Sequence, residues 1–139
     1  MAPGCVFCGV VAGEVAAHTV HRDGEVVAIL DHRPLFPGHV LVLPVEHRAE
    51  LADLPAERVG PFFSAVRQVA GAVETAMDAH GTFVAINNKV SQSVPHLHVH
   101  VVPRRFKDGL RGFFWPRQRY AGGEDEMAEV AAAIRRFLP

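Results

Sequence analysis

Three histidines alternate with apolar residues in one short stretch of the chain. His96, His98 and His100 are separated by Leu97 and Val99. Successive side chains of a β-strand point to opposite faces, so the three imidazoles would share one face at intervals of roughly 6.5–7 Å. A phosphate and its two bridging oxygens span a similar distance, so this stretch is a candidate site for chemistry on a phosphate group.

Two other interpretations of the histidine stretch stay open. It could be a surface strand whose outward polar residues happen to be histidine. Alternatively, all three histidines could bind one metal ion. Imidazoles two positions apart on a strand can reach one ion, whereas the third would have to swing further.

The chain has only two cysteines, and they form the pair Cys5-x-x-Cys8. Such a pair is equally consistent with a redox motif and with half of a zinc site. Thioredoxin-type motifs follow a strand within a βαβ unit, whereas this pair lies at the N-terminus. A closed tetrahedral zinc site would need two further ligands from elsewhere in the chain.

Length and composition predict one globular domain over residues 1–139. The chain is 49% apolar and carries a formal net charge of −1. No basic excess favours nucleic-acid binding, and no apolar run is long enough to span a membrane. The N-terminus lacks the features of a secretory signal, so we expect a cytoplasmic protein.

Hydrophobic periodicity and turn residues predict the elements that position these side chains. The pattern indicates an α+β domain with five antiparallel strands and its helices on one face of the sheet. One long helix should be kinked or broken near Pro61. A C-terminal helix should turn Met127, Val130 and Ile134 inward. The expected strands cover 18–22, 25–31, 39–43, 82–87 and 95–103, and the expected helices cover 6–11, 53–81 and 124–138.

The stretch HLHVHVV resembles the His-φ-His-φ-His-φ-φ signature (φ apolar) of the histidine-triad, or HIT, superfamily of nucleotide hydrolases and transferases. The block from Asp31 through Pro34, Gly38-His39 and Pro44 to His47 also resembles that family's conserved block. The N-terminal CVFCGVVAGE and the loop before the triad are similar as well. The resemblance covers residues 5–105, so the chain is identified as a member with a C-terminal extension over 106–139.

The resemblance implies a covalent mechanism in which His98 is the nucleophile. A nucleotidyl-His98 intermediate would form at the α-phosphate and then pass to water or another acceptor. His100 and His39 would be the further catalytic histidines of the site. The remaining histidines 18, 21 and 80 are expected to face solvent, and His32 could edge the pocket.

The resemblance also implies a set of substrate-binding residues. A carboxylate would bind the ribose hydroxyls, apolar side chains would enclose the base, and loop side chains would contact the phosphates. These residues are Asp31; Phe7, Val10 and Ile29; and Gln92, Ser93, Asn87 and Asn88.

In many bacterial relatives the cysteine pair binds zinc together with two histidines. The matching positions here are His47 and His96, so the resemblance implies one zinc ion held by Cys5, Cys8, His47 and His96. Four protein ligands leave no open position for water, so this zinc would be structural. It would connect the N-terminus to the catalytic strand.

Three features depart from the family pattern. Ser91 stands where relatives have glycine, and Asn87 and Asn88 lie closer to the triad than the usual asparagine. The segment Gly109–Arg117 contains the only Trp with two Phe and two Arg. It could reach the far side of the substrate, with Arg111 or Arg117 on a distal phosphate, or it could pack the C-terminal helix onto the core.

The resemblance implies a homodimeric enzyme that acts on purine nucleoside phosphoramidates or dinucleoside polyphosphates. A nucleotide-binding regulatory protein with incidental catalysis is the main alternative. A metal-dependent hydrolase that uses the triad as ligands is a third.

Overall fold

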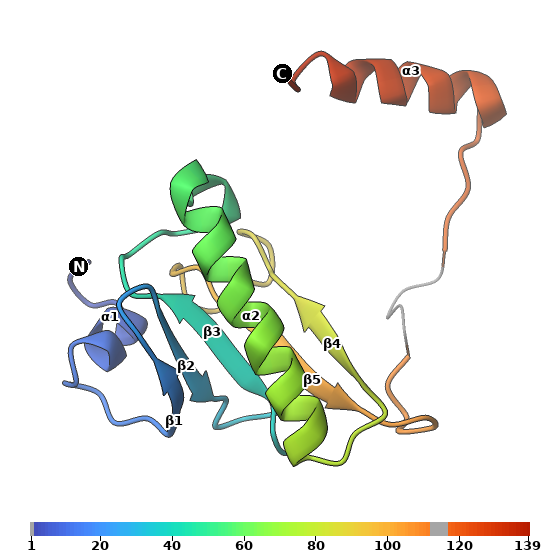
Figure 1. Ribbon diagram of the computed structural model, residues 1–139. Coiled ribbons are helices and arrows are strands. Elements are labelled where there is room, and N and C mark those ends of the chain that lie inside the picture. The colour runs from blue at the N-terminus through green and yellow to red at the C-terminus, as the bar shows by residue number, and fades with distance from the viewer. Residues whose placement is uncertain (1, 112–116) are drawn as a thin grey trace. The chain divides into compact units, whose positions relative to one another are not determined.

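The computed structural model describes residues 2–111 and 117–139. Figure 1 shows the described elements in chain order. The chain divides into two compact units, Met1–Asp108 and Gly109–Pro139, and each is described by itself.

The first unit is built on one five-stranded antiparallel sheet, in the order β1-β2-β3-β5-β4. This confirms the predicted α+β class. The strands are β1 (Thr19–Arg22), β2 (Val26–Leu30), β3 (Val40–Pro44), β4 (Gly81–Ala85) and β5 (Val99–Arg104).

The β1–β2 hairpin turns at Asp23-Gly24, as the sequence predicts. The Asp23 carboxylate accepts hydrogen bonds from the backbone N–H groups of Glu25 and Val26, at 2.7 and 2.9 Å. An aspartate that binds the backbone two and three residues ahead stabilises a tight turn. These bonds lower the pKa of Asp23 below its usual range.

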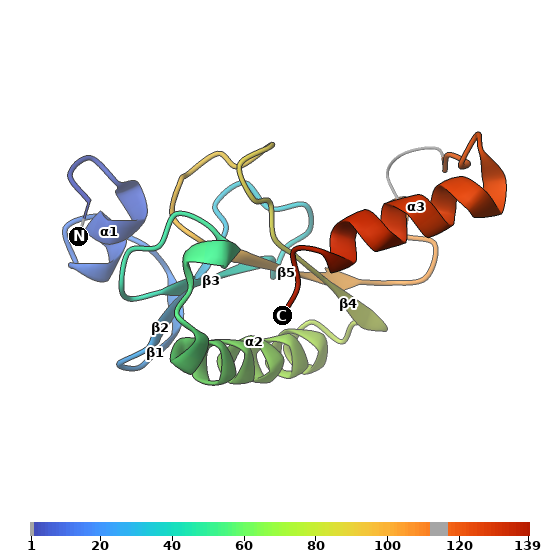
Figure 2. The ribbon, with the colours of Figure 1, turned by 90° about the horizontal axis from the view of Figure 1, so that it is seen from above.

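Both faces of the sheet are covered, whereas the sequence analysis expected helices on one face only. The long helix α2 (Ala56–Ala76) packs on the face that carries Val26 and Ala28. The short helix α1 (Val6–Val11) packs on the opposite face, against Val27 and Ile29. Figure 2 shows the two helices on either side of the sheet. The expectation was wrong because β2 and β3 are apolar on both faces, so each face needs a cover.

Helix α2 is continuous, so Pro61 does not break it. Pro61 lies in the second turn, where its missing N–H removes one backbone hydrogen bond. The predicted start at Asp53 was too early, because Leu51–Asp53 forms a separate 3₁₀ turn and Pro55 caps α2. The buried face of α2 consists of Phe62, Ala65, Val66, Val69 and Val73.

The second unit contains α3 (Gly123–Arg135), which buries none of its residues. Among its described residues this unit provides no cover for Met127, Val130 and Ile134, so their inward orientation stays a prediction. Within the segment Gly109–Arg117, which the sequence analysis placed either on the substrate or against the core, residues 112–116 lie outside the described residues. Among the described helices, none is long and apolar enough to cross a membrane.

Candidate functional site

The predicted alternation of the histidine stretch is present at the start of β5. Leu97, Val99 and Val101 lie in the core under α2. His98 and His100 lie on the other face, with ring centroids 5.0 Å apart. Strand β5 begins only at Val99, later than predicted, because the backbone N–H of Leu97 bonds the Arg48 carbonyl in a loop.

His98 is held by the backbone just before it. Its Nδ1 lies 2.7 Å from the carbonyl oxygen of His96. A carbonyl only accepts hydrogen bonds, so Nδ1 carries the hydrogen and Nε2 keeps its lone pair. The ring is 4% exposed and meets Phe7 edge-on at 5.1 Å. This is the tautomer that a nucleophilic Nε2 requires.

His100 of β5 and His39, which immediately precedes β3, contact each other directly. His39 Nε2 lies 3.0 Å from His100 Nδ1 and 3.8 Å from an Asp31 carboxylate oxygen. Burial, with smaller contributions from the neighbouring His98 and His39, lowers the pKa of His100 to about 4. Burial also lowers the pKa of His39. Both imidazoles are therefore neutral at physiological pH.

A cavity of about 540 Å³ opens beside these histidines. His98, His100 and Ser93 lie together in its lining with Asp31, and apolar side chains from α1 and β2 complete it. The structure brings seven of the predicted site residues to this cavity, namely Phe7, Val10, Ile29, Asp31, Ser93, His98 and His100.

Two further histidines line the cavity. The sequence analysis gave His32, next to Asp31, as a residue that could edge the pocket, whereas His18 was expected to face solvent. His18 is exposed, but its carbonyl accepts a hydrogen bond from the N–H of Leu30. The predicted hairpin pairs the start of β1 with the end of β2, and this pairing could have placed His18 at the cavity.

Three predicted phosphate-binding residues do not line the cavity. The Gln92 side chain donates to the Ala49 carbonyl at 2.6 Å and accepts from the Lys89 N–H at 3.0 Å. Asn88 accepts from the backbone N–H of Leu51 at 2.9 Å. Asn87 is likewise outside the lining. The described contacts of Gln92 and Asn88 connect loops, because the short loop before the triad folds back on residues 49–51.

Cys5, Cys8, His47 and His96 form a separate cluster. Their ligand atoms all lie within 4.8 Å of one another. The distance is 3.3 Å from Cys8 Sγ to His47 Nδ1, 3.5 Å from Cys5 Sγ to His96 Nδ1, and 3.2 Å between the two Nδ1 atoms. Tetrahedral zinc with its normal bond lengths separates S and N ligands by about 3.5 Å and two N ligands by about 3.3 Å. The four side chains therefore fit a zinc ion.

The hydrogen bonds of His96 support this fit. Its Nε2 lies 2.9 Å from the Pro44 carbonyl, so Nε2 carries the hydrogen and Nδ1 presents its lone pair to the cysteines. His96 is fully buried, and burial lowers its pKa to about 4, which keeps the ring neutral as a metal ligand must be. The cluster also separates His96 from His98 and His100, so the three triad histidines do not converge on one ion.

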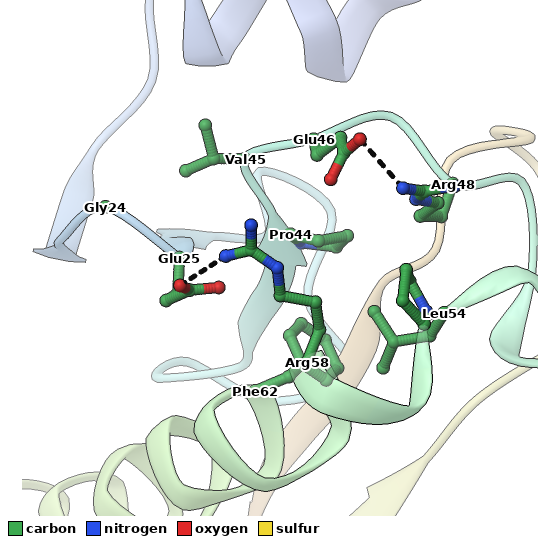
Figure 3. A pocket seen from close by; sticks show the side chains of 10 residues that line it. Gly24, Glu25, Pro44, Val45, Glu46, Arg48, Leu54, Arg58 and Phe62 are labelled. Atoms are coloured by element: carbon green, nitrogen blue, oxygen red, sulfur yellow. Dashed lines mark hydrogen bonds and ion pairs between the residues drawn. The ribbon is translucent and has the colours of Figure 1, made fainter.

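A smaller cavity of about 120 Å³ lies on the α2 side of the segment that carries His47. Figure 3 shows that two ion pairs line it, Arg58 with Glu25 and Arg48 with Glu46. Both cations face carboxylates already, so this cavity offers less to a charged ligand than the cavity beside the histidines.

Comparison with known proteins gives a consistent result. The sequence model of the HIT domain matches residues 12–107. An uncharacterized HIT-like protein of Mycobacterium tuberculosis is 41% identical over 108 residues, 76% of this chain and 75% of that protein.

Two relatives carry enzyme names. Adenylylsulfatase HINT3 of Arabidopsis thaliana is 29% identical over 136 residues, which is 96% of this chain and 69% of that protein. The asymmetrical bis(5'-nucleosyl)-tetraphosphatase of Schizosaccharomyces pombe is 33% identical over 96 residues, 68% of this chain and 53% of that protein.

Solved structures agree with the fold. SMU.412c of Streptococcus mutans superposes with a TM-score of 0.90 at 28% identity, covering 100% of this chain and 88% of that one. A zinc-bound histidine triad family protein of Mycobacterium smegmatis gives a TM-score of 0.73 at 35% identity, covering 94% of this chain and 97% of that one.

Proposed function

The chain belongs to the HIT domain family, and we propose that it is a nucleotide hydrolase or transferase acting at an α-phosphate through a nucleotidyl-His98 intermediate. The substrates would be purine nucleoside phosphoramidates or dinucleoside polyphosphates. The observation that carries the proposal is the tautomer of His98, whose Nδ1–H is bound to the His96 carbonyl beside a cavity that His98 lines.

In the first step the Nε2 lone pair of His98 attacks the α-phosphorus. A P–N bond forms, and the bond from phosphorus to the leaving oxygen or nitrogen breaks with its electron pair. The leaving group takes a proton from solvent water, while the Nε2–H of the neutral His100 on the same face can hydrogen-bond the departing atom. Water or another acceptor then attacks phosphorus and releases its proton to solvent, the P–N bond breaks, and its electron pair returns to Nε2.

The cavity supports a nucleoside as the bound group. Asp31 offers a carboxylate to ribose hydroxyls, and Phe7, Val10 and Ile29 offer apolar surface to a base. Ser93 offers a hydroxyl donor to a phosphate oxygen. Gln92, Asn87 and Asn88 are not part of this assignment, because they lie outside the lining of the cavity.

We further propose that Cys5, Cys8, His47 and His96 hold one structural zinc ion. Zinc with four protein ligands supplies rigidity and no reactive water. The backbone carbonyl of His96 orients His98, so holding His96 in place also holds the nucleophile. A homodimer in the cytoplasm, with residues 1–139 as one HIT domain and its extension, completes the proposal; light scattering tests the dimer.

The test is His98→Ala assayed with adenosine and guanosine phosphoramidates and with diadenosine tri- and tetraphosphate. We expect turnover to fall at least about a thousandfold, because the nucleophile is gone, while nucleoside monophosphate still binds in calorimetry. His21→Ala, in the hairpin away from the cavity, is the control and should keep wild-type turnover.

Two outcomes would contradict the mechanism. Turnover that survives in His98→Ala would exclude the covalent route. Nucleotide binding by a wild-type protein that turns over none of these substrates would favour the regulatory alternative.

A further inference from the structure

His39 is held between a backbone amide and a second imidazole. The N–H of Leu35 lies 3.1 Å from His39 Nδ1, and His39 Nε2 lies 3.0 Å from His100 Nδ1. Only 3% of His39 is exposed, so solvent has little access to replace either bond. Leu35 precedes β3, in the turn between Pro34 and Gly38.

These contacts determine where the hydrogens lie. A backbone amide only donates, so His39 Nδ1 must accept and Nε2 must carry the ring hydrogen. That hydrogen points to His100 Nδ1, which must accept in turn. His100 therefore carries its own hydrogen on Nε2. One amide thus sets the tautomers of two histidines in sequence.

The same reasoning argues against a metal ion bound by Asp31, His39 and His100, although their ligand atoms are close enough to surround one. A metal at His39 Nε2 would need a lone pair there, while the Leu35 amide already uses the lone pair on Nδ1. The ring would have to become an anion. His96 differs, because its outer nitrogen faces a carbonyl and its inner nitrogen is free to bind a metal.

We propose that the backbone amide of Leu35 is a positioning group of the reaction site, which fixes His39 as the Nε2–H tautomer and through it makes His100 a neutral Nε2–H donor. This rests on the proposed function, in which His100 donates to the phosphate or to the leaving atom. His39 acts on the substrate only through His100. A proton on His39 Nδ1 would face the amide N–H directly, so the arrangement also opposes a cationic His39.

The first test measures tautomers without substrate. Long-range ¹H–¹⁵N spectra of the ring nitrogens of the full, zinc-loaded chain at pH 7 distinguish Nδ1–H from Nε2–H for each histidine. We expect Nε2–H for His39 and His100 and Nδ1–H for His98. An Nδ1–H tautomer at His39 would overturn the proposal.

The second test removes the amide hydrogen alone. Leucic acid in place of Leu35 converts its N–H into an ester oxygen. We expect His39 and His100 then to exchange between tautomers, and kcat to fall at least about tenfold with little change in KM. Leucic acid at Leu51 is the matched control, because that amide donates to the Asn88 side chain outside the cavity. Unchanged tautomers in the Leu35 ester would refute the role of its amide.

A third test asks whether an N–H donor at the position of His39 Nε2 is what sets the tautomer of His100. His39→Gln keeps an N–H donor near the Nε2 position, whereas His39→Asn does not reach His100. We expect His100 to keep the Nε2–H tautomer in His39→Gln and to lose it in His39→Asn. The same tautomer in both variants would contradict the proposal that His39 sets the tautomer of His100. If the tautomers behave as stated but the wild type turns over no nucleotide, the proposed function fails and the positioning assignment stands.

Discussion

His96 and His98 show how a main-chain partner decides the use of a side chain. They are two residues apart and both buried, but a carbonyl binds the Nε2 of one and the Nδ1 of the other. His96 therefore presents Nδ1 to the cysteine pair, and His98 keeps the lone pair on Nε2. In the proposed function this difference of one hydrogen position separates a metal ligand from a nucleophile.

The half-buried His100 predicts a dependence of stability on pH. Its pKa falls from the usual 6.5 to about 4 on folding, chiefly through burial. Between these values the unfolded chain binds a proton that the folded chain does not. Stability should therefore fall as the pH drops from about 6.5 to 4, by at most about 3 kcal/mol for this residue.

His100→Gln should remove this contribution, so that the variant loses less stability than the wild type between pH 7 and pH 4.5. Urea unfolding at both pH values measures the difference. Equal losses in wild type and His100→Gln would show that His100 is not the group responsible.

At the scale of elements, the loop before β5 contains a strained residue. Ser91 has φ 61°, in the left-handed region, at the position where the family pattern has glycine. A non-glycine residue in this conformation costs roughly 1–2 kcal/mol. Glycine avoids that cost, but part of the gain is lost because glycine gives up more backbone entropy on folding. The positive φ at this position therefore explains why the family pattern has glycine there.

Ser91→Gly should stabilise the protein by about 0.5–1 kcal/mol, measured by urea unfolding. The matched control is Ser64→Gly on the exposed side of α2, where the same substitution should destabilise by roughly 0.5 kcal/mol. Loss of stability in Ser91→Gly would mean that the serine side chain contributes more than its backbone costs.

The helices α2 and α3 should respond very differently to truncation of an apolar side chain. Phe62 in α2 is 2% exposed and central to the core, so Phe62→Ala should cost about 3–5 kcal/mol. The second unit taken by itself leaves Ile134 in α3 exposed, so Ile134→Ala should stay within about 0.5 kcal/mol of wild type. Thermal unfolding of both variants checks this. A large loss in Ile134→Ala would show that α3 packs its apolar face in solution.

For the whole molecule, the cysteine–histidine cluster joins distant parts of the chain. It brings the N-terminal segment with Cys5 and Cys8 to His47 after β3 and to His96 before β5. A metal bound there stabilises only the folded chain, because the unfolded chain does not assemble the four ligands.

The native protein, purified without a histidine tag, should contain about one zinc per chain. A strong chelator should lower its Tm by at least about 5 °C, since the loss of a structural zinc removes several kcal/mol. Cys8→Ser should lose the metal and show no further effect of the chelator, whereas His80→Ala should keep it. Elemental analysis and calorimetry measure both effects. A native protein with well under half a zinc per chain would rule out the site.

Much of the fold was predictable because its signals are local. The Asp23-Gly24 turn, the alternation at Leu97 to Val101 and the succession of strands all depend on neighbours in sequence. The cover on both faces of the sheet was missed, because an apolar strand pattern does not tell which helix packs on which face. What the apolar face of α3 contacts stays a prediction, because amphipathic periodicity shows that such a face exists and not what it contacts.

The sequence by itself determined the α+β class, the shared face of the triad histidines and the family, since these depend on residue type and spacing along one chain. Only the tertiary structure decided which ring nitrogen of each histidine carries the hydrogen. The partners of His39 and His96 are the Leu35 amide and the Pro44 carbonyl, and hydrogen-bond direction at those contacts sets each tautomer. The Gln92 side chain likewise finds its partner in the Ala49 carbonyl. A hydrogen bond depends on position and angle in space, which spacing along the chain does not encode.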